Sequence, residues 1–162
     1  MNNLVLIGFM GSGKGTIGRL LARKTGRFFL DTDALIESFA NRSIVEIFRT
    51  ETEEAFRRYE RDLAAWLARS VSAAVIATGG GMATAISRDD LRSIGETIYL
   101  QCDFATIARR LANEAEREKR PLAASIETLR DRFLEREAIY RARADRIIDA
   151  NQSVEAVLEA IG

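Results

Sequence analysis

The sequence contains no histidine, one cysteine and one proline among its 162 residues. Without histidine, histidine-based triads, proton shuttles and histidine zinc sites are excluded, so a general base must be a carboxylate or a lysine. With Cys102 alone, neither an internal disulfide nor a multi-thiolate metal site can form. The single proline, Pro121, and the lack of a Ser/Gly/Pro-rich tract leave no obvious linker, and the length predicts one domain over residues 1–162.

The chain also lacks an excess of either charge. Its 24 Lys and Arg residues balance 24 Asp and Glu residues, so nothing global indicates binding to nucleic acid or to an anionic membrane. The longest early apolar run, residues 4–10, is too short for a membrane span of about 20 residues and has no basic leader. A composition of 47% hydrophobic and 30% charged residues favours a globular domain. We expect a cytoplasmic protein without a signal peptide.

Apolar runs rich in branched residues alternate with helical patterns, which predicts an α/β fold with a parallel sheet. The predicted strands are residues 4–8, 28–31, 73–78, 96–101 and 146–149. Helices are predicted at about 14–24, 34–40, 126–143 and 153–161, with another that begins at a capping box formed by Thr50 and Glu53. Trp66 and the phenylalanines are interpreted as core, and Cys102 as a small buried or partly buried residue. In residues 109–120, 8 of 12 side chains are charged, which indicates a solvated insertion or a mobile cover.

The strongest motif is GFMGSGKGT at residues 8–16, between the first strand and the first helix. This context is typical of a P-loop, whose backbone N–H groups surround a phosphate while a lysine reaches the β- and γ-phosphates. The motif predicts a nucleoside triphosphate site. The residues expected to bind ATP here are Gly11, Ser12, Gly13, Lys14, Gly15 and Thr16.

The loop departs from the usual P-loop at one position. A serine or threonine normally follows the lysine and holds magnesium, but here Gly15 follows it and the hydroxyl comes at Thr16. This GKGT form resembles the loop of adenylate kinases. Our hypothesis is that Mg2+ is held by the phosphates, by water ordered on Asp31, and by Thr16, which would reduce activity or raise the magnesium requirement.

Two features after the next strands suggest an acceptor site. Asp31 and Asp33, at positions i and i+2 of a strand end, can share a face toward the crevice. One can hold magnesium through water while the other accepts a proton from a substrate hydroxyl; the alternative is that one of them caps the following helix. The three glycines at 79–81 indicate either a tight turn or close approach to a ligand, and their position favours the ligand.

At this point the chain resembles the shikimate kinase family over essentially its whole length. The motifs that carry the resemblance are the loop at 8–16, Asp31-Thr32-Asp33, residues 43–48, Phe56-Arg57-Arg58 with Glu60, Gly79-Gly80-Gly81, Arg120-Pro121-Leu122, and Arg136 with Tyr140. The resemblance implies a P-loop kinase fold with a five-stranded parallel sheet in the order 2-3-1-4-5, flanked by helices. It further implies an acceptor-binding region at about 31–60, a lid at about 111–124, and transfer of the γ-phosphoryl group of ATP to the 3-hydroxyl of shikimate, in aromatic amino acid biosynthesis.

The resemblance also implies roles for individual residues. Asp33 would bind the ring hydroxyls and act as the base, while Arg57 and Arg136 would grip the shikimate carboxylate. The backbone of Gly80, flanked by Gly79 and Gly81, would donate to the acceptor. The remaining implied roles are Arg120 over the transferring phosphate, Asp31 toward magnesium-bound water, and Arg110 with Gln152 beside the adenine. Mg2+ would be the cofactor, and the family favours a monomer.

Less specific interpretations remain open from the residues themselves. Arg57 lies four residues after Glu53 and could form only a surface ion pair, and Arg136 could belong to a solvated helix face. The GKGT loop also suits another small-molecule or nucleotide kinase of the same fold, although we find no acceptor pattern of a nucleoside monophosphate kinase. A regulatory nucleotide-binding module would explain Gly15 but not the retained Asp33, Arg57, Arg120 and Arg136. A purely structural α/β domain would have little reason to keep Lys14 in such a loop.

Overall fold

A computed structural model describes residues 2–118 and 125–162. Five parallel strands form one sheet in the order β2-β3-β1-β4-β5. The strands are β1 (Asn3–Ile7), β2 (Phe28–Asp31), β3 (Ala74–Ala77), β4 (Gly95–Gln101) and β5 (Arg146–Asp149). The predicted order is confirmed, and each strand boundary lies within one residue of its prediction.

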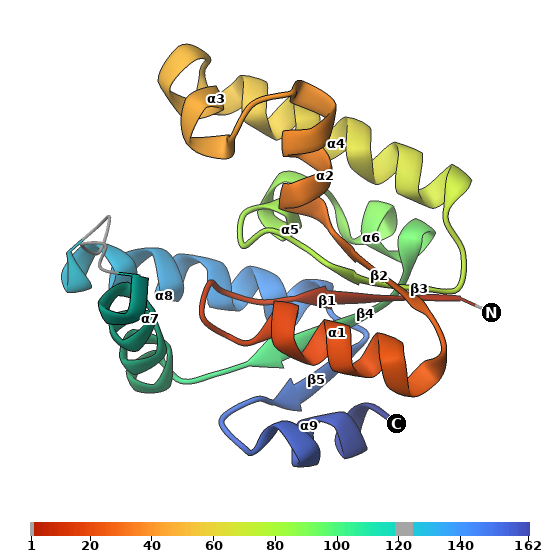
Figure 1. The fold of residues 1–162 in the computed structure, drawn as a ribbon, viewed down its shortest axis with the longest axis vertical. Coiled ribbons are helices and arrows are strands. Elements are labelled where there is room, and N and C mark those ends of the chain that lie inside the picture. Colours follow the sequence, from red (N-terminus) through yellow and green to blue (C-terminus); the bar gives the residue numbers. More distant parts are fainter. Residues whose placement is uncertain (1, 119–124) are drawn as a thin grey trace.

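Helices cover both faces of the sheet (Figure 1). On one face, α1 (Lys14–Thr25) packs on β1, β2 and β3, and α9 (Val154–Ile161) packs beside it on β5. On the other face, α6 (Arg88–Ile94) and α8 (Ile126–Arg143) contact β4. Because both faces are covered, β3 is buried along its whole length, which explains its unbroken apolar sequence.

The segment 31–60, predicted as the acceptor-binding region, includes α2 (Thr32–Ala40), α3 (Ile44–Thr50) and the start of α4 (Glu53–Ser70). These helices share a small core of Ile36, Ile47 and Phe56, separate from the main core around the sheet. In Figure 1 they lie together beyond one face of the sheet, above α5 (Met82–Ala85). The small core fixes the start of α4, and Arg57 directly follows Phe56 in this helix.

Two sequence predictions are wrong in detail. The box of Thr50 and Glu53 does not form, because Thr50 belongs to the last turn of α3 and its hydroxyl donates to the Glu46 carbonyl; Thr52 caps α4 instead, accepting from Ala55 N. Asp33 lies in the first turn of α2 and not on a strand end. Residues 109–118, the described part of the charged stretch, continue the helix α7 (Phe104–Glu118).

The prediction that the aromatic residues form the core also fails in part. Phe9, Phe56 and Phe133 are buried, but Trp66 keeps 43% of its surface exposed and Phe39 keeps 82%. Cys102 is buried, as predicted. Within the described residues, no helix combines the length and apolar character needed to cross a bilayer.

Candidate active site

The phosphate loop connects β1 to α1 and depends on glycine at two positions. Gly11 and Gly13 have φ angles of 77° and 95°, in the left-handed region that favours glycine. Gly13 is also the N-cap residue of α1, and it has no side chain to occupy the helix N-terminus. The loop therefore presents backbone amides and the positive end of α1 to the same space, as a bound phosphate requires.

Lys14 lies at the centre of this loop. Its Nζ donates to the carbonyls of Gly8 and Phe9, at 2.7 and 2.9 Å. Desolvation lowers the pKa of its ammonium to about 8, although the nearby carboxylates of Asp33 and Asp31 act in the opposite direction. A triphosphate would add strong negative charge beside this ammonium and raise its pKa again.

A cleft of about 720 Å3 opens over the loop at the carboxyl edge of the sheet. Lys14, Asp31, Asp33 and Gly80 all line it. Asp31 also caps α2, since its Oδ1 accepts from the backbone N of Asp33 at 3.0 Å and of Ala34 at 3.3 Å. The capping role and a position in the cleft therefore coexist for Asp31.

Asp33 differs from Asp31 in its electrostatic environment. Burial raises the pKa of the Asp33 carboxyl, and the neighbouring Asp31 carboxylate adds to the rise, while Lys14 partly offsets it. A raised pKa brings a carboxylate closer to the operating pH, which improves it as a general base.

The three glycines at 79–81 each meet a different predicted acceptor residue. A Cβ at Gly79 would overlap the Asp33 carboxylate, and one at Gly81 would overlap the Arg57 guanidinium. At Gly80 the neighbouring side chain is Arg136, whose Nη1 would lie 3.6 Å from an added Cβ. Gly79 and Gly81 therefore leave room for the Asp33 carboxylate and the Arg57 guanidinium, and the turn gathers the carboxylate and both guanidiniums.

Arg57 is held by two carboxylates of its own helix. Its Nη1 donates to Glu60 Oε2 at 2.7 Å, and its Nη2 donates to Glu53 Oε1 at 3.0 Å. Glu60 is 1% exposed, and burial raises the pKa of its carboxyl, which Arg57 partly offsets. The surface-pair interpretation of Arg57 is thus incomplete, because the side chain pairs with Glu53 and also contacts the glycine turn.

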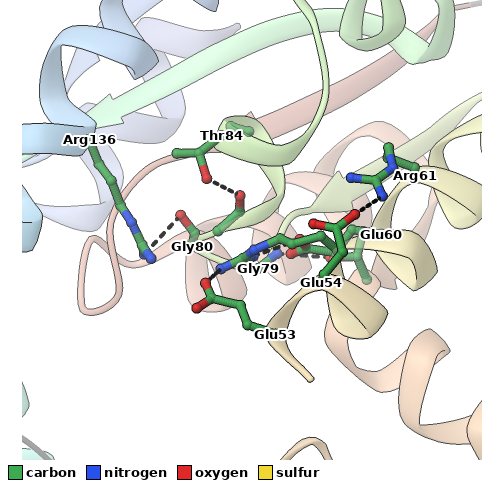
Figure 2. A network of polar contacts seen from close by, with 12 residues as sticks. Glu53, Glu54, Glu60, Arg61, Gly79, Gly80, Thr84 and Arg136 are labelled. Carbon is green, nitrogen blue, oxygen red and sulfur yellow. Dashed lines mark hydrogen bonds and ion pairs between the residues drawn. The ribbon is translucent and has the colours of Figure 1, made fainter. Parts of the chain in front are cut away.

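Arg136 and Tyr140 extend from α8 to the same turn. Arg136 Nη1 donates to the Gly80 carbonyl at 3.3 Å, as Figure 2 shows, and the Tyr140 hydroxyl donates to that carbonyl as well. Arg136 is also close to the ring of Phe9, with 5.8 Å between Cζ and the ring centroid. One face of α8, with Tyr140 fully buried, therefore holds the glycine turn against the phosphate loop.

A second cavity of about 200 Å3 lies on the other side of the loop, toward β5 and α9. Ser12, Arg110 and Gln152, all predicted to bind ATP, line it. Arg110 donates to the carbonyls of Gly11 and Ala150, at 3.3 and 3.0 Å, and so joins the phosphate loop to the turn after β5. The cavity thus adjoins the phosphate loop through Ser12, Gly13 and Thr16.

The donor set around Lys14 suits magnesium bound to phosphate. Asp31 supplies a carboxylate, Thr16 an exposed hydroxyl, and Gly15 no side-chain ligand, while its carbonyl accepts from Arg19 at 3.1 Å. The described residues hold no cluster of three or more acidic, cysteine or histidine side chains that would form a protein-only metal site. Mg2+ commonly keeps several waters and takes one or two carboxylates plus phosphates, so these residues fit it. Arg120, predicted over the transferring phosphate, lies outside the described residues.

Two contact residues were not assigned roles from the sequence. Glu60 and Tyr140 occur in the quoted motifs, but their spacing alone did not show that both reach the glycine turn or its arginines. The available signal was helical spacing, since Glu60 follows Arg57 by three residues and Tyr140 follows Arg136 by four.

A phosphate loop at the switch point of a parallel sheet, beside a glycine turn that gathers a carboxylate and two arginines, defines a P-loop kinase that acts on a small molecule. The family model for shikimate kinase matches residues 10–162. The chain is 46% identical over 153 residues to the shikimate kinase of Helicobacter hepaticus, covering 94% of this chain and 89% of that protein. The chain belongs to the shikimate kinase family, whose members are phosphotransferases with an alcohol group as acceptor.

Solved structures agree with this assignment. Shikimate kinase from Acinetobacter baumannii in complex with shikimate has a TM-score of 0.87 and 36% identity, covering 99% of this chain and 90% of that one. Shikimate kinase from Aquifex aeolicus has a TM-score of 0.81 and 31% identity, with 98% and 93% covered. A gluconokinase from Sinorhizobium meliloti, at 15% identity and a TM-score of 0.60, shares the fold alone; the alignment covers 98% of this chain and 87% of the gluconokinase.

Proposed function

We propose how the residues of this cleft divide the work of phosphorylating the 3-hydroxyl of shikimate with ATP, the reaction of the family to which the chain belongs. The observation that carries the assignment is the glycine turn at 79–81, which contacts Asp33, Arg136 and Arg57 in succession beside the phosphate loop. Shikimate is a small cyclic polyol with one carboxylate. A turn that gathers one carboxylate and two guanidiniums matches the two ends of such a molecule.

On the nucleotide side, the loop amides and Lys14 bind the phosphates, and Arg110 with Gln152 line the space for the adenine. Lys14 neutralises charge on the transferring group, which is the main catalytic demand of phosphoryl transfer. Mg2+ supplies further charge neutralisation when it is bound with ATP. Asp31 would hold it through water and Thr16 through its hydroxyl, since Gly15 has no ligand atom in its side chain.

On the acceptor side, Asp33 orients the ring hydroxyls and accepts the proton of the 3-hydroxyl. Arg57 and Arg136 bind the carboxylate at the opposite end of the ring, where a forked guanidinium can form two parallel hydrogen bonds. Among the described residues, the Gly79 amide is occupied by the Thr32 hydroxyl at 2.8 Å, whereas the Gly80 amide has no protein acceptor. This difference supports Gly80 as the backbone donor to shikimate.

The single domain of residues 1–162 would work as a monomer in the cytoplasm, with residues 31–60 as the acceptor-binding region and 111–124 as the lid. Of that lid, residues 111–118 form the end of α7, and residues 119–124 are outside the described part. In this role Arg120 would approach the transferring phosphate and exclude water from the closed site.

The carboxylate clamp is tested by replacing each arginine with alanine. Loss of one partner in a desolvated charge-assisted contact costs roughly 2–5 kcal/mol. We therefore expect Arg57→Ala or Arg136→Ala to lower kcat/KM for shikimate by at least about a hundredfold, with the KM for ATP near the wild-type value. The matched control is Arg58→Ala, because Arg58 is exposed and adjacent to Arg57 in the same helix. Near-wild-type efficiency of both clamp variants with shikimate would show that the assignment is wrong.

A further inference from the structure

Arg57 reaches the glycine turn with each of its terminal nitrogens already donating to a carboxylate, and the two carboxylates differ in their exposure. Glu60 is 1% exposed, so moving it away from Arg57 would leave a buried charge unpaired. Glu53 has 72% of its side chain exposed, so its carboxylate can leave Arg57 and be solvated by water. Only Glu53 is therefore free to exchange with an incoming anion.

Helix geometry places Glu53 at the exposed start of α4. It is the first residue of α4, after the cap Thr52, and Arg57 follows one turn later on the same face. Figure 2 draws Glu53 and Arg136 in the same region of polar contacts, where Arg136 donates to the Gly80 carbonyl. The carboxylate of Glu53 thus occupies an Arg57 donor next to the turn at which the acceptor's own carboxylate would bind.

The neighbouring Glu54 shows that this contact is not general to the helix end. Glu54 has 71% of its side chain exposed, nearly the same as Glu53, but it pairs with Arg61 at 2.6 Å. In Figure 2 that pair lies apart from Arg136. Two adjacent glutamates with equal charge and similar exposure therefore differ mainly in whether they contact Arg57.

We propose that Glu53 competes with the acceptor, because its carboxylate occupies Arg57 in the empty site and is displaced by the carboxylate of the acceptor. This inference rests on the clamp proposed above. An incoming ligand must compensate for the lost contact between Glu53 and Arg57. A carboxylate that binds both arginines compensates for that loss, whereas an uncharged analogue forms no ion pair with Arg57. Glu53 thereby lowers the affinity for an acceptor carboxylate that binds Arg57.

The sign of the effect distinguishes this role from a structural one. If Glu53 only positioned Arg57, its replacement would weaken acceptor binding. If Glu53 competes with the acceptor, Glu53→Gln keeps the size of the side chain, removes the charge and strengthens binding. Exposed ion pairs of this kind are weak, so we expect the Kd for shikimate to fall about two- to fivefold. The methyl ester of shikimate, which has no charge, should bind both proteins equally.

The experiment is calorimetric titration of shikimate into the wild type, Glu53→Gln and Glu54→Gln, and into Arg57→Ala with and without Glu53→Gln. The proposal expects tighter binding for Glu53→Gln, no change for Glu54→Gln, and no effect of Glu53→Gln once Arg57 is absent. Unchanged or weaker binding by Glu53→Gln overturns it. An equal gain in Glu54→Gln, or a gain that persists without Arg57, also overturns it by showing a general charge effect. Wild-type shikimate binding by Arg57→Ala would instead refute the clamp itself.

Discussion

At the residue scale, burial and neighbouring charge give like side chains different tasks. Asp31 and Asp33 are two positions apart, yet Asp31 is engaged by the backbone amides of α2, while burial and the charge of Asp31 raise the pKa of Asp33. Arg57 and Arg58 are adjacent, yet only Arg57 is part of the buried network with Glu60. These differences follow from the direction in which each side chain leaves its helix, which helix phase predicts and residue type alone does not.

The lowered pKa of Lys14, about 8 without nucleotide, predicts a pH dependence of ATP binding. Below pH 8 the ammonium is already charged, so binding needs no proton there. Above pH 8 the free protein loses this proton while bound phosphates favour it, so the Kd for ATP should rise by up to tenfold per pH unit, with proton uptake. Calorimetry at pH 7.5 and 9 in buffers of different ionisation heat measures both effects. Lys14→Arg, which stays charged, should show no proton uptake. If the wild type had the same pH profile as Lys14→Arg, the pH dependence could not be assigned to Lys14.

At the element scale, the turn at 79–81 and helix α8 act as one unit. Arg136 and Tyr140 donate to the Gly80 carbonyl, and Arg143 donates to the carbonyls of Ala83 and Ile86 around α5. These three side chains, at intervals of four and three residues, face the same side of α8. The turn is thereby fixed relative to Arg136, which preorganises the acceptor site.

Gly81→Ala tests the requirement for space at this turn. The new Cβ would meet the end of the Arg57 side chain, which can move, so we expect the free energy of unfolding to change by less than about 1 kcal/mol. The displaced guanidinium should raise the KM for shikimate at least about tenfold and leave the KM for ATP unchanged. In the contrasting variant Gly95→Ala the Cβ meets the Asn3 backbone, so a loss of stability is expected instead. A normal KM for shikimate in Gly81→Ala would show that Arg57 does not need the space at Gly81 to bind the acceptor.

At the scale of the whole molecule, the sheet supplies the phosphate loop at its carboxyl edge, and the helices outside it supply the acceptor residues. The strands and their parallel arrangement were predictable because strands covered on both faces are continuously apolar, whereas the sheet order came from the family resemblance.

Local capping rules were insufficient: Thr50 with Glu53 and Ser43 with Glu46 have the same spacing, but only the second pair forms a box. The acceptor residues were named from motifs, yet their convergence on one turn depends on contacts between distant helices. For the same reason, the contacts of Glu60 and Tyr140 emerged only from the structure.

The most direct test of the account is a crystal structure of the chain with shikimate and ADP. It should place the carboxylate of shikimate against both Arg57 and Arg136, and the 3-hydroxyl within hydrogen-bond distance of Asp33 on the side facing Lys14. A shikimate bound with its carboxylate away from both arginines, or with the 3-hydroxyl turned away from Asp33 and the phosphate loop, would contradict it.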